Sequence, residues 1–286
     1  MPCVPPACLP AASFTLPRDS HTTAYMWRST VHRLLGRDDL ELRRDLAAAH
    51  HLSHAYRFDD LIWNHISARV PGHATKYMVT SGTEHFDEVT ASSLVLSTSA
   101  NANATTDTIH GAIYAARPDV MAIVHHHSTA VVAVSALPEG FKCLSQESTA
   151  FHGNIAYHDY QGVSDSSGEG ARIVEALGTK CHTLIMRNHG ACTTGASVAE
   201  AWVRYYYLDL CCRQQLAVAH VPRLIELPKA VLEHSAAQFA PGTMYQHGNM
   251  EWTALRRHAA RLQARARCER LLAWWVGLVC WILGED

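Results

Sequence analysis

A run of five apolar residues followed by three histidines is the feature that most constrains the fold. Residues 120 to 124, Val-Met-Ala-Ile-Val, are typical of a β-strand buried on both faces. His125, His126 and His127 continue this run. Because side chains alternate along an extended chain, we expect His125 and His127 on one face and His126 on the other. The sequence therefore predicts a buried strand that ends in two neighbouring imidazoles.

A second strand-like stretch, residues 183 to 187, also leads to a histidine, His189, which is followed by Gly190. Three imidazoles can hold zinc or another borderline divalent ion and leave one coordination position open for a substrate oxygen. This makes His125, His127 and His189 candidate metal ligands. The chain has 20 histidines, so a chance cluster of solvated or hydrogen-bonded histidines is the alternative.

The composition is that of a globular protein. With 48% hydrophobic and 17% charged residues, a chain of 286 residues can bury a substantial core. The formal net charge of −2 gives no general attraction to nucleic acid, so we expect no nucleic-acid partner. The nine cysteines form no C-x-x-C pair, which indicates buried reduced thiols in a cytoplasmic protein rather than a disulfide scaffold.

Three regions are predicted along the chain. Residues 1–25, rich in Pro, Ser, Thr and Ala, are expected to be a disordered tail, with a mitochondrial transit peptide as the alternative. Residues 26–262 are expected to form one domain, and residues 263–286 a basic and apolar extension. Its apolar segment, residues 271–283, is shorter than the about 20 residues of a membrane-spanning helix. We expect it to pack on the chain's own core, with a membrane surface or the cytoskeleton as the alternative partner.

Helical and strand patterns alternate through the middle of the chain. Helices are predicted at 38–57, 107–116, 129–137, 167–177 and 197–218, and strands at 61–70, 77–80, 94–96, 120–124 and 182–187. Asp107 is a predicted N-cap, and Ser197 with Glu200 forms a predicted capping box. This alternation predicts an α/β fold in which a sheet lies between two layers of helices.

Six ordered blocks give the chain a resemblance to a known family. They are residues 64–69 (NHISAR), 86–92 (FDEVTAS), 109–119 (IHGAIYAARPD), 124–128 (VHHHS), 156–160 (AYHDY) and 187–190 (RNHG). In this order the blocks resemble the class II aldolase/adducin family, and most closely the head domains of adducins and their bacterial relatives. The resemblance implies a three-layer α/β/α fold with a central, mainly antiparallel β-sheet, and a homotetramer.

The resemblance also implies roles for individual residues. The zinc ligands of the family match His125, His127 and His189. The loops that bind the substrate phosphate in the aldolases match Asn64, Ser67, Ser81 and Gly82. The glutamate that acts as general acid and base in the aldolases falls at Thr106, so the neighbouring Asp107 becomes the candidate for proton transfer.

Two functions of different classes follow. The first is a zinc-dependent lyase or epimerase that acts on a sugar phosphate or a related hydroxy-carbonyl compound, with Asp107 as its catalytic residue. The second is a catalytically inactive, adducin-like binding module for cytoskeletal or other proteins, which retains the fold and the metal. Because Thr106 replaces the expected glutamate, we predict weak or no activity on standard aldolase substrates.

Overall fold

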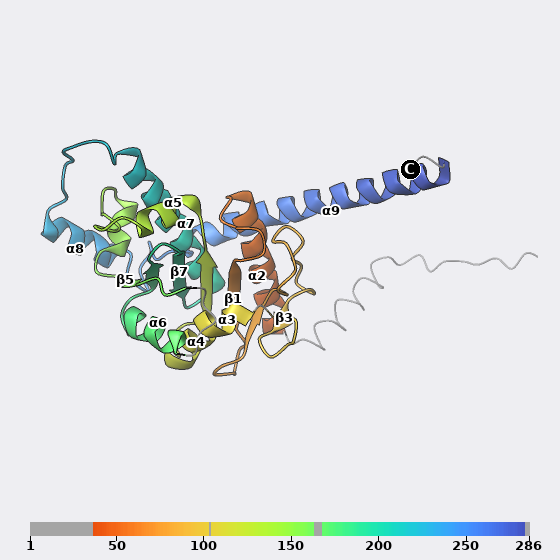
Figure 1. Ribbon diagram of the computed structural model, residues 1–286, viewed down its shortest axis with the longest axis horizontal. Helices are drawn as coiled ribbons and strands as arrows, with labels where there is room; N and C mark the ends of the chain where they lie inside the picture. The colour runs from red at the N-terminus through yellow and green to blue at the C-terminus, as the bar shows by residue number, and fades with distance from the viewer. Residues whose placement is uncertain (1–36, 103, 163–167, 284–286) are drawn as a thin grey trace, which may run out of the picture.

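The computed structural model describes residues 37–102, 104–162 and 168–283 (Figure 1). The predicted tail, residues 1–25, lies outside them. The strands of the described residues form a seven-stranded sheet in the order β3-β2-β1-β4-β7-β6-β5. Their bounds are β1 His65–Arg69, β2 Tyr77–Val79, β3 Val95–Leu96, β4 Ala122–His126, β5 Ile155–His158, β6 Thr183–Met186 and β7 Gly190–Gly195. All neighbours pair antiparallel except β5 and β6, so the mainly antiparallel sheet is confirmed.

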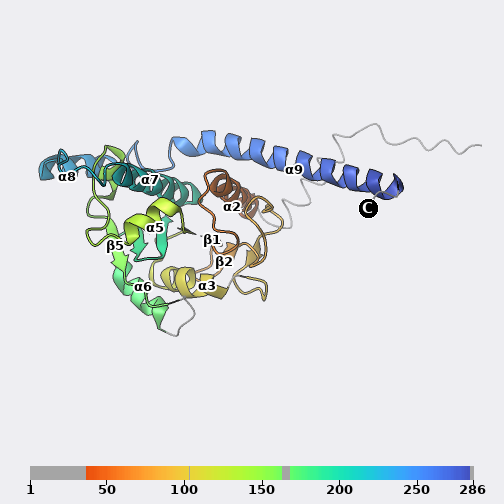
Figure 2. The same ribbon diagram turned by 45° about the horizontal axis from the view of Figure 1, so that its top comes forward.

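Helices cover both faces of the sheet (Figure 2). One layer consists of α2 (Arg37–Ala55), α5 (Thr129–Ser135), α7 (Val198–Ala217) and the start of α9 (Glu251–Leu283). The other consists of α3 (Ala104–Thr106), the π-helix η1 (Asp107–Gly111), α4 (Ala112–Ala116) and α6 (Glu169–Leu177). The 3-10 helix η2 (Glu147–Phe151) and α8 (Lys229–Gln238) pack together at one end. A hydrophobic cluster fills each space between sheet and helices, which confirms the predicted three-layer α/β/α fold.

Strand β4 lies in the middle of the sheet, between β1 and β7, and all of its residues are buried. The ring of His126 points into the core, where its Nε2 lies 2.9 Å from Ser53 Oγ of α2. The same hydroxyl accepts a hydrogen bond of 2.9 Å from the Trp202 indole of α7. His125 and His127 point to the opposite side. The predicted alternation of the three histidines is therefore confirmed.

Strands β6 and β7 form a hairpin whose turn carries His189. Asn188 adopts a left-handed conformation (φ 56°) in this turn, which asparagine tolerates better than most residues. At Gly190 a Cβ atom would lie 2.5 Å from the backbone oxygen of His126. The absence of a side chain at Gly190 thus lets β7 approach β4 closely, and this approach places His189 beside the end of β4. The sequence did not predict β7, because Gly-Ala-Cys-Thr-Thr-Gly has no alternating apolar pattern.

The predicted N-cap at Asp107 is wrong. The chain is already helical at Ala104, and Asp107 begins the π-helical segment η1 within the same helical stretch. Its carboxylate accepts a hydrogen bond from the hydroxyl of Tyr77 on β2 and does not cap the helix. A contact made across 30 residues therefore determines the position of this side chain.

Two other predicted boundaries behave differently. At the start of α7 the Ser197 hydroxyl accepts a hydrogen bond of 3.1 Å from the Glu200 amide, as predicted, whereas the Glu200 carboxylate bonds the amide of Ala196. The predicted strand 61–70 is shorter than expected, because Leu61 adopts a left-handed conformation (φ 50°) in a turn that precedes β1.

Helix α9 packs against α2 near its start and then extends beyond the domain (Figure 1). It is continuous across the expected domain boundary at residue 262. Five of its apolar residues are exposed: Leu271, Leu272, Trp274, Trp275 and Val276. The prediction that this segment packs on the chain's own core is thus wrong for residues 271–276. Among the described helices, α9 included, none combines the length and the apolar character needed to cross a membrane.

The close approach of β7 to β4 gives a first prediction. Gly190→Ala should lower the free energy of unfolding by about 2 to 3 kcal/mol, because the new methyl group would overlap the His126 carbonyl. Gly72→Ala is the control, since open space surrounds that position and only its positive φ carries a cost, about 1 kcal/mol. Urea unfolding measures both. Equal costs would contradict the packing argument.

Candidate metal centre

Three imidazoles converge at one end of the sheet. One ligand atom from each of His125, His127 and His189 lies within 4.8 Å of the other two. The Nε2 atoms of His125 and His127 are 3.0 Å apart. The centroid of the His189 ring lies 5.0 Å from that of His125 and 4.7 Å from that of His127. Strand β4 supplies His125, the residue just after its end is His127, and the β6–β7 turn supplies His189. The structure thus brings together all three histidines that the sequence nominated.

Hydrogen bonds on the far side of two rings orient their nitrogens. His125 Nδ1 lies 3.2 Å from the carbonyl oxygen of Ala191, and His127 Nδ1 lies 3.3 Å from Asp60 Oδ2. Because only a protonated Nδ1 can donate to these oxygens, each Nε2 keeps its lone pair for a metal. Asn64 supports this arrangement, since its side-chain oxygen accepts a hydrogen bond of 2.5 Å from the Asp60 amide. Sequence reasoning missed Asp60.

The protonation states of the three histidines also favour metal binding. Burial lowers the pKa of His189 to about 4 and that of His125 well below its usual value. Burial also lowers the pKa of His127, despite the opposing effect of Asp60. All three rings are therefore neutral at pH 7, which is the form that binds metal. In a tetrahedral zinc site the ligand nitrogens lie about 3.3 Å apart, so this donor set fits zinc or a similar divalent ion.

The three histidines open onto a cavity of about 330 Å³. The rest of its wall consists of Asp60, Trp63, His65, Thr105, Ile109, Tyr160 and Gly162. His65 is the most informative of these, because it stands opposite His125 in the β1–β4 register and its ring lies 4.8 Å from that of His125. In the sequence, His65 stands out only as a member of the block 64–69. A strand register would have been needed to place it beside His125.

The four candidate phosphate-binding residues occupy two environments. Ser81 and Gly82 line a second hollow, which shares Trp63 and Thr105 with the histidine cavity. Asn64 is buried, and its side-chain nitrogen has no hydrogen-bond partner among the residues described. The fourth residue, Ser67, is fully buried behind the cavity wall.

The structure shows which carboxylate side chains lie near the histidine cavity. Thr106, at the position of the family glutamate, is fully buried, whereas its neighbour Thr105 lines the histidine cavity. Asp107 accepts the hydrogen bond from Tyr77 and is not part of the cavity wall. Asp60 is the one carboxylate that lines this cavity within the described chain.

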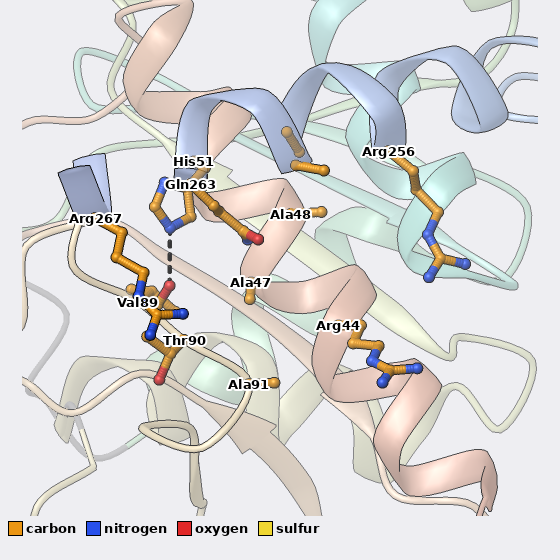
Figure 3. Close-up of a pocket in the computed structure, with 12 residues that line it drawn as sticks. Arg44, Ala47, Ala48, His51, Val89, Thr90, Ala91, Arg256, Gln263 and Arg267 are labelled. Carbon is orange, nitrogen blue, oxygen red and sulfur yellow. Dashed lines mark hydrogen bonds between the residues drawn. The ribbon is translucent and has the colours of Figure 1, made fainter. Parts of the chain in front are cut away.

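A separate hollow of about 400 Å³ lies between α2 and α9 (Figure 3). Its floor contains alanines of both helices, and His51 donates a hydrogen bond to the carbonyl of Val89 at its edge. Arg44 and Arg256 on its rim both pair with Glu41, which offsets their charge. The described metal-ligand clusters lie elsewhere, so the histidine cavity is the better candidate site.

Comparison with known proteins agrees with this geometry. The model of the family described as "Class II Aldolase and Adducin N-terminal domain" matches residues 44–216. The chain belongs to this family. The match includes β1, the three histidines and most of α7.

The chain is similar to an aldolase II superfamily protein and to an adducin, and it shares its fold with an aldolase. A crystal structure of an aldolase II superfamily protein from Pseudomonas syringae is 34% identical, with a TM-score of 0.73, and covers 81% of this chain and 97% of that protein. L-fuculose 1-phosphate aldolase from Glaciozyma antarctica has a TM-score of 0.70 over 81% of this chain and 93% of its own, but at 24% identity it shows the fold alone. Alpha-adducin from Rattus norvegicus is 36% identical over 76% of this chain, which corresponds to 32% of the adducin.

The orientation of the rings predicts the metal behaviour of single variants. Purified protein loaded with zinc should hold about one ion per chain. His127→Ala should abolish binding, and Asp60→Asn should weaken it about 10- to 100-fold, because the aspartate holds the Nδ1 proton of His127. Elemental analysis and zinc titration measure both effects.

His126→Ala is the matched control, because this neighbouring ring faces the core. It should lower stability but keep the ion. Equal loss of zinc from the His126 and His127 variants would contradict the assignment of the site.

Proposed function

We propose that the protein is a divalent-metal-dependent lyase or epimerase, with zinc as the preferred ion, that acts on a sugar phosphate or a related hydroxy-carbonyl compound. The observation that carries this proposal is the convergence of His125, His127 and His189 on one cavity, with the Nε2 atoms of the first two free to bind a metal. A bound divalent ion would polarise a substrate carbonyl and stabilise the enediolate that forms when a neighbouring bond breaks.

The two adjoining hollows support a phosphorylated substrate. The reacting carbons would occupy the histidine cavity, and the phosphate would lie beyond Trp63 and Thr105, in the hollow that Ser81 and Gly82 line. There the Ser81 hydroxyl is a candidate donor to phosphate. Asn64 is the second candidate from the sequence, since its side-chain nitrogen has no partner among the described atoms, but the residue is buried and lines neither hollow. The Gly82 amide contributes less, since it already donates to the carbonyl of Asn101.

Proton transfer is the weak part of this active site. Asp107, the candidate from the sequence, would have to release the Tyr77 hydroxyl and turn toward the cavity before it could act as a base. Asp60 already lines the cavity, but it accepts the Nδ1 proton of His127. A base that must give up another interaction transfers protons less effectively, so we expect slow turnover.

An adducin-like binding module is the second candidate function. It is supported by the similarity to alpha-adducin and by the threonine at position 106. In this case the metal site would stabilise the fold, and the chain would bind other proteins, with the cytoskeleton or a membrane surface as partner. The exposed apolar residues 271–276 of α9 favour a partner at that end. Under either function we expect a homo-oligomer, most simply a tetramer with closed symmetry.

Substitutions at neighbouring threonines test the enzyme proposal. Thr105→Glu should place a carboxylate in the cavity and raise the rate of aldol cleavage by about 10²-fold or more, because it supplies the missing acid and base. The measurement is release of a triose or glycolaldehyde product from a panel of phosphorylated sugars. The control is Thr106→Glu, which would bury a charge in the core and should lower the melting temperature without any gain in rate.

The outcomes separate the two functions. Measurable cleavage by the wild type that rises in Thr105→Glu supports the lyase. If the wild type and both variants bind zinc and leave every sugar phosphate unchanged, the lyase proposal is contradicted and the binding module is the better account.

A further inference from the structure

A chain of four buried polar groups leads from the core to the wall of the histidine cavity. The Tyr114 hydroxyl lies 2.9 Å from Ser67 Oγ, and that oxygen lies 2.7 Å from His110 Nδ1. On the other side of the ring, His110 Nε2 lies 3.0 Å from His65 Nδ1. All four residues are at most 1% exposed. This series of hydrogen bonds ends at His65 Nε2, since His65 also lines the cavity.

Tyr114 determines the direction of these hydrogen bonds. Within the described part of the chain, its hydroxyl has Ser67 as its only hydrogen-bond partner. If Ser67 donated to Tyr114, the phenolic hydrogen would be buried without an acceptor, an arrangement disfavoured by about 10- to 100-fold. Tyr114 therefore donates to Ser67, and Ser67 donates in turn to His110 Nδ1.

The same direction continues to the cavity. With its Nδ1 accepting, the neutral ring of His110 carries its hydrogen on Nε2 and donates to His65 Nδ1. His65 then carries its own hydrogen on Nε2, which faces Thr105 Oγ1 at 3.5 Å. A contact of this length is weak, so this N–H group remains able to bind a ligand in the cavity.

Both rings stay neutral in this environment. Burial lowers the pKa of His110 to about 3, and His65 Nδ1, which accepts the hydrogen of His110 Nε2, carries no hydrogen of its own. A neutral imidazole is a hydrogen-bond donor that stabilises a negative oxygen without giving its proton away.

We infer that His65 donates its Nε2–H to a negatively charged oxygen of the substrate, an enediolate or carboxylate oxygen bound beside His125, His127 and His189. The inference rests on the proposed function, because the reaction is what creates a negative oxygen there. Tyr114, Ser67 and His110 are positioning residues, which hold His65 in the donating tautomer. Ser67 thus belongs to this series of hydrogen bonds and does not bind a substrate phosphate.

Neutron diffraction from deuterium-exchanged crystals at pH 7 tests the tautomer without any reaction. Deuterium should appear on Nε2 of His65 and of His110, and on neither Nδ1. Deuterium on His65 Nδ1 would overturn the inference, whatever the activity of the protein.

Binding of glycolate to the zinc-loaded protein tests the donor role. Calorimetry should show about 10-fold weaker binding in His65→Leu, with one zinc per chain retained, and partial recovery in His65→Gln, whose amide can donate. Tyr77→Phe is the matched control. The Tyr77 ring packs on Tyr114, but its hydroxyl donates to Asp107 and takes no part in the series of hydrogen bonds that leads to His65. That variant should bind glycolate like the wild type.

Three results would overturn the inference: no glycolate binding to the wild type, unchanged affinity in His65→Leu, or loss of zinc from that variant, which would make His65 a metal ligand. Weakened glycolate binding in a protein that cleaves no sugar phosphate would contradict the proposed lyase and still support His65 as the donor.

Discussion

The position of β4 between β1 and β7 is the constraint on which the rest of the structure depends. His126 anchors the strand in the core through Ser53 of α2, which also accepts the hydrogen bond of Trp202 from α7. Because neighbouring side chains point to opposite faces, this anchor directs His125 and His127 toward the cavity. Gly190 then allows β7 to lie against the same strand and brings His189 beside them. One buried ring and one missing side chain thus bring the three candidate metal ligands together.

Features that depend on local pattern were predictable from the sequence. The alternation of the three histidines needs only an extended backbone, and the Ser197 cap needs only residues three positions apart. Features that depend on distant contacts were not. Asp107 fits the N-cap pattern, yet its carboxylate accepts a hydrogen bond from Tyr77. The position of His65 beside His125 arises from strand register. Strand β7 escaped prediction because pairing with β4 and β6, and not an apolar pattern of its own, holds it in the sheet.

The chemistry of the site follows from how its neutral histidines are held. Backbone and carboxylate acceptors direct the lone pairs of His125 and His127 toward a shared point, whereas the buried chain from Tyr114 gives His65 the opposite polarity, a hydrogen facing the cavity. Such a site can stabilise negative charge on oxygen well and moves protons poorly. This combination is what the proposed slow lyase requires, and loss of the proton-transfer group would leave the alternative, a binding module.

The central claim is that His125, His127 and His189 hold one divalent ion with a coordination position open to the cavity. Anomalous diffraction at the zinc absorption edge, from crystals of the zinc-loaded protein, tests it most directly. The account predicts one strong peak, about 2.0 to 2.1 Å from one nitrogen of each ring, with a non-protein ligand on the side of the cavity. A zinc-loaded crystal with no peak among these rings, or with a fourth protein side chain closing the site, would contradict it.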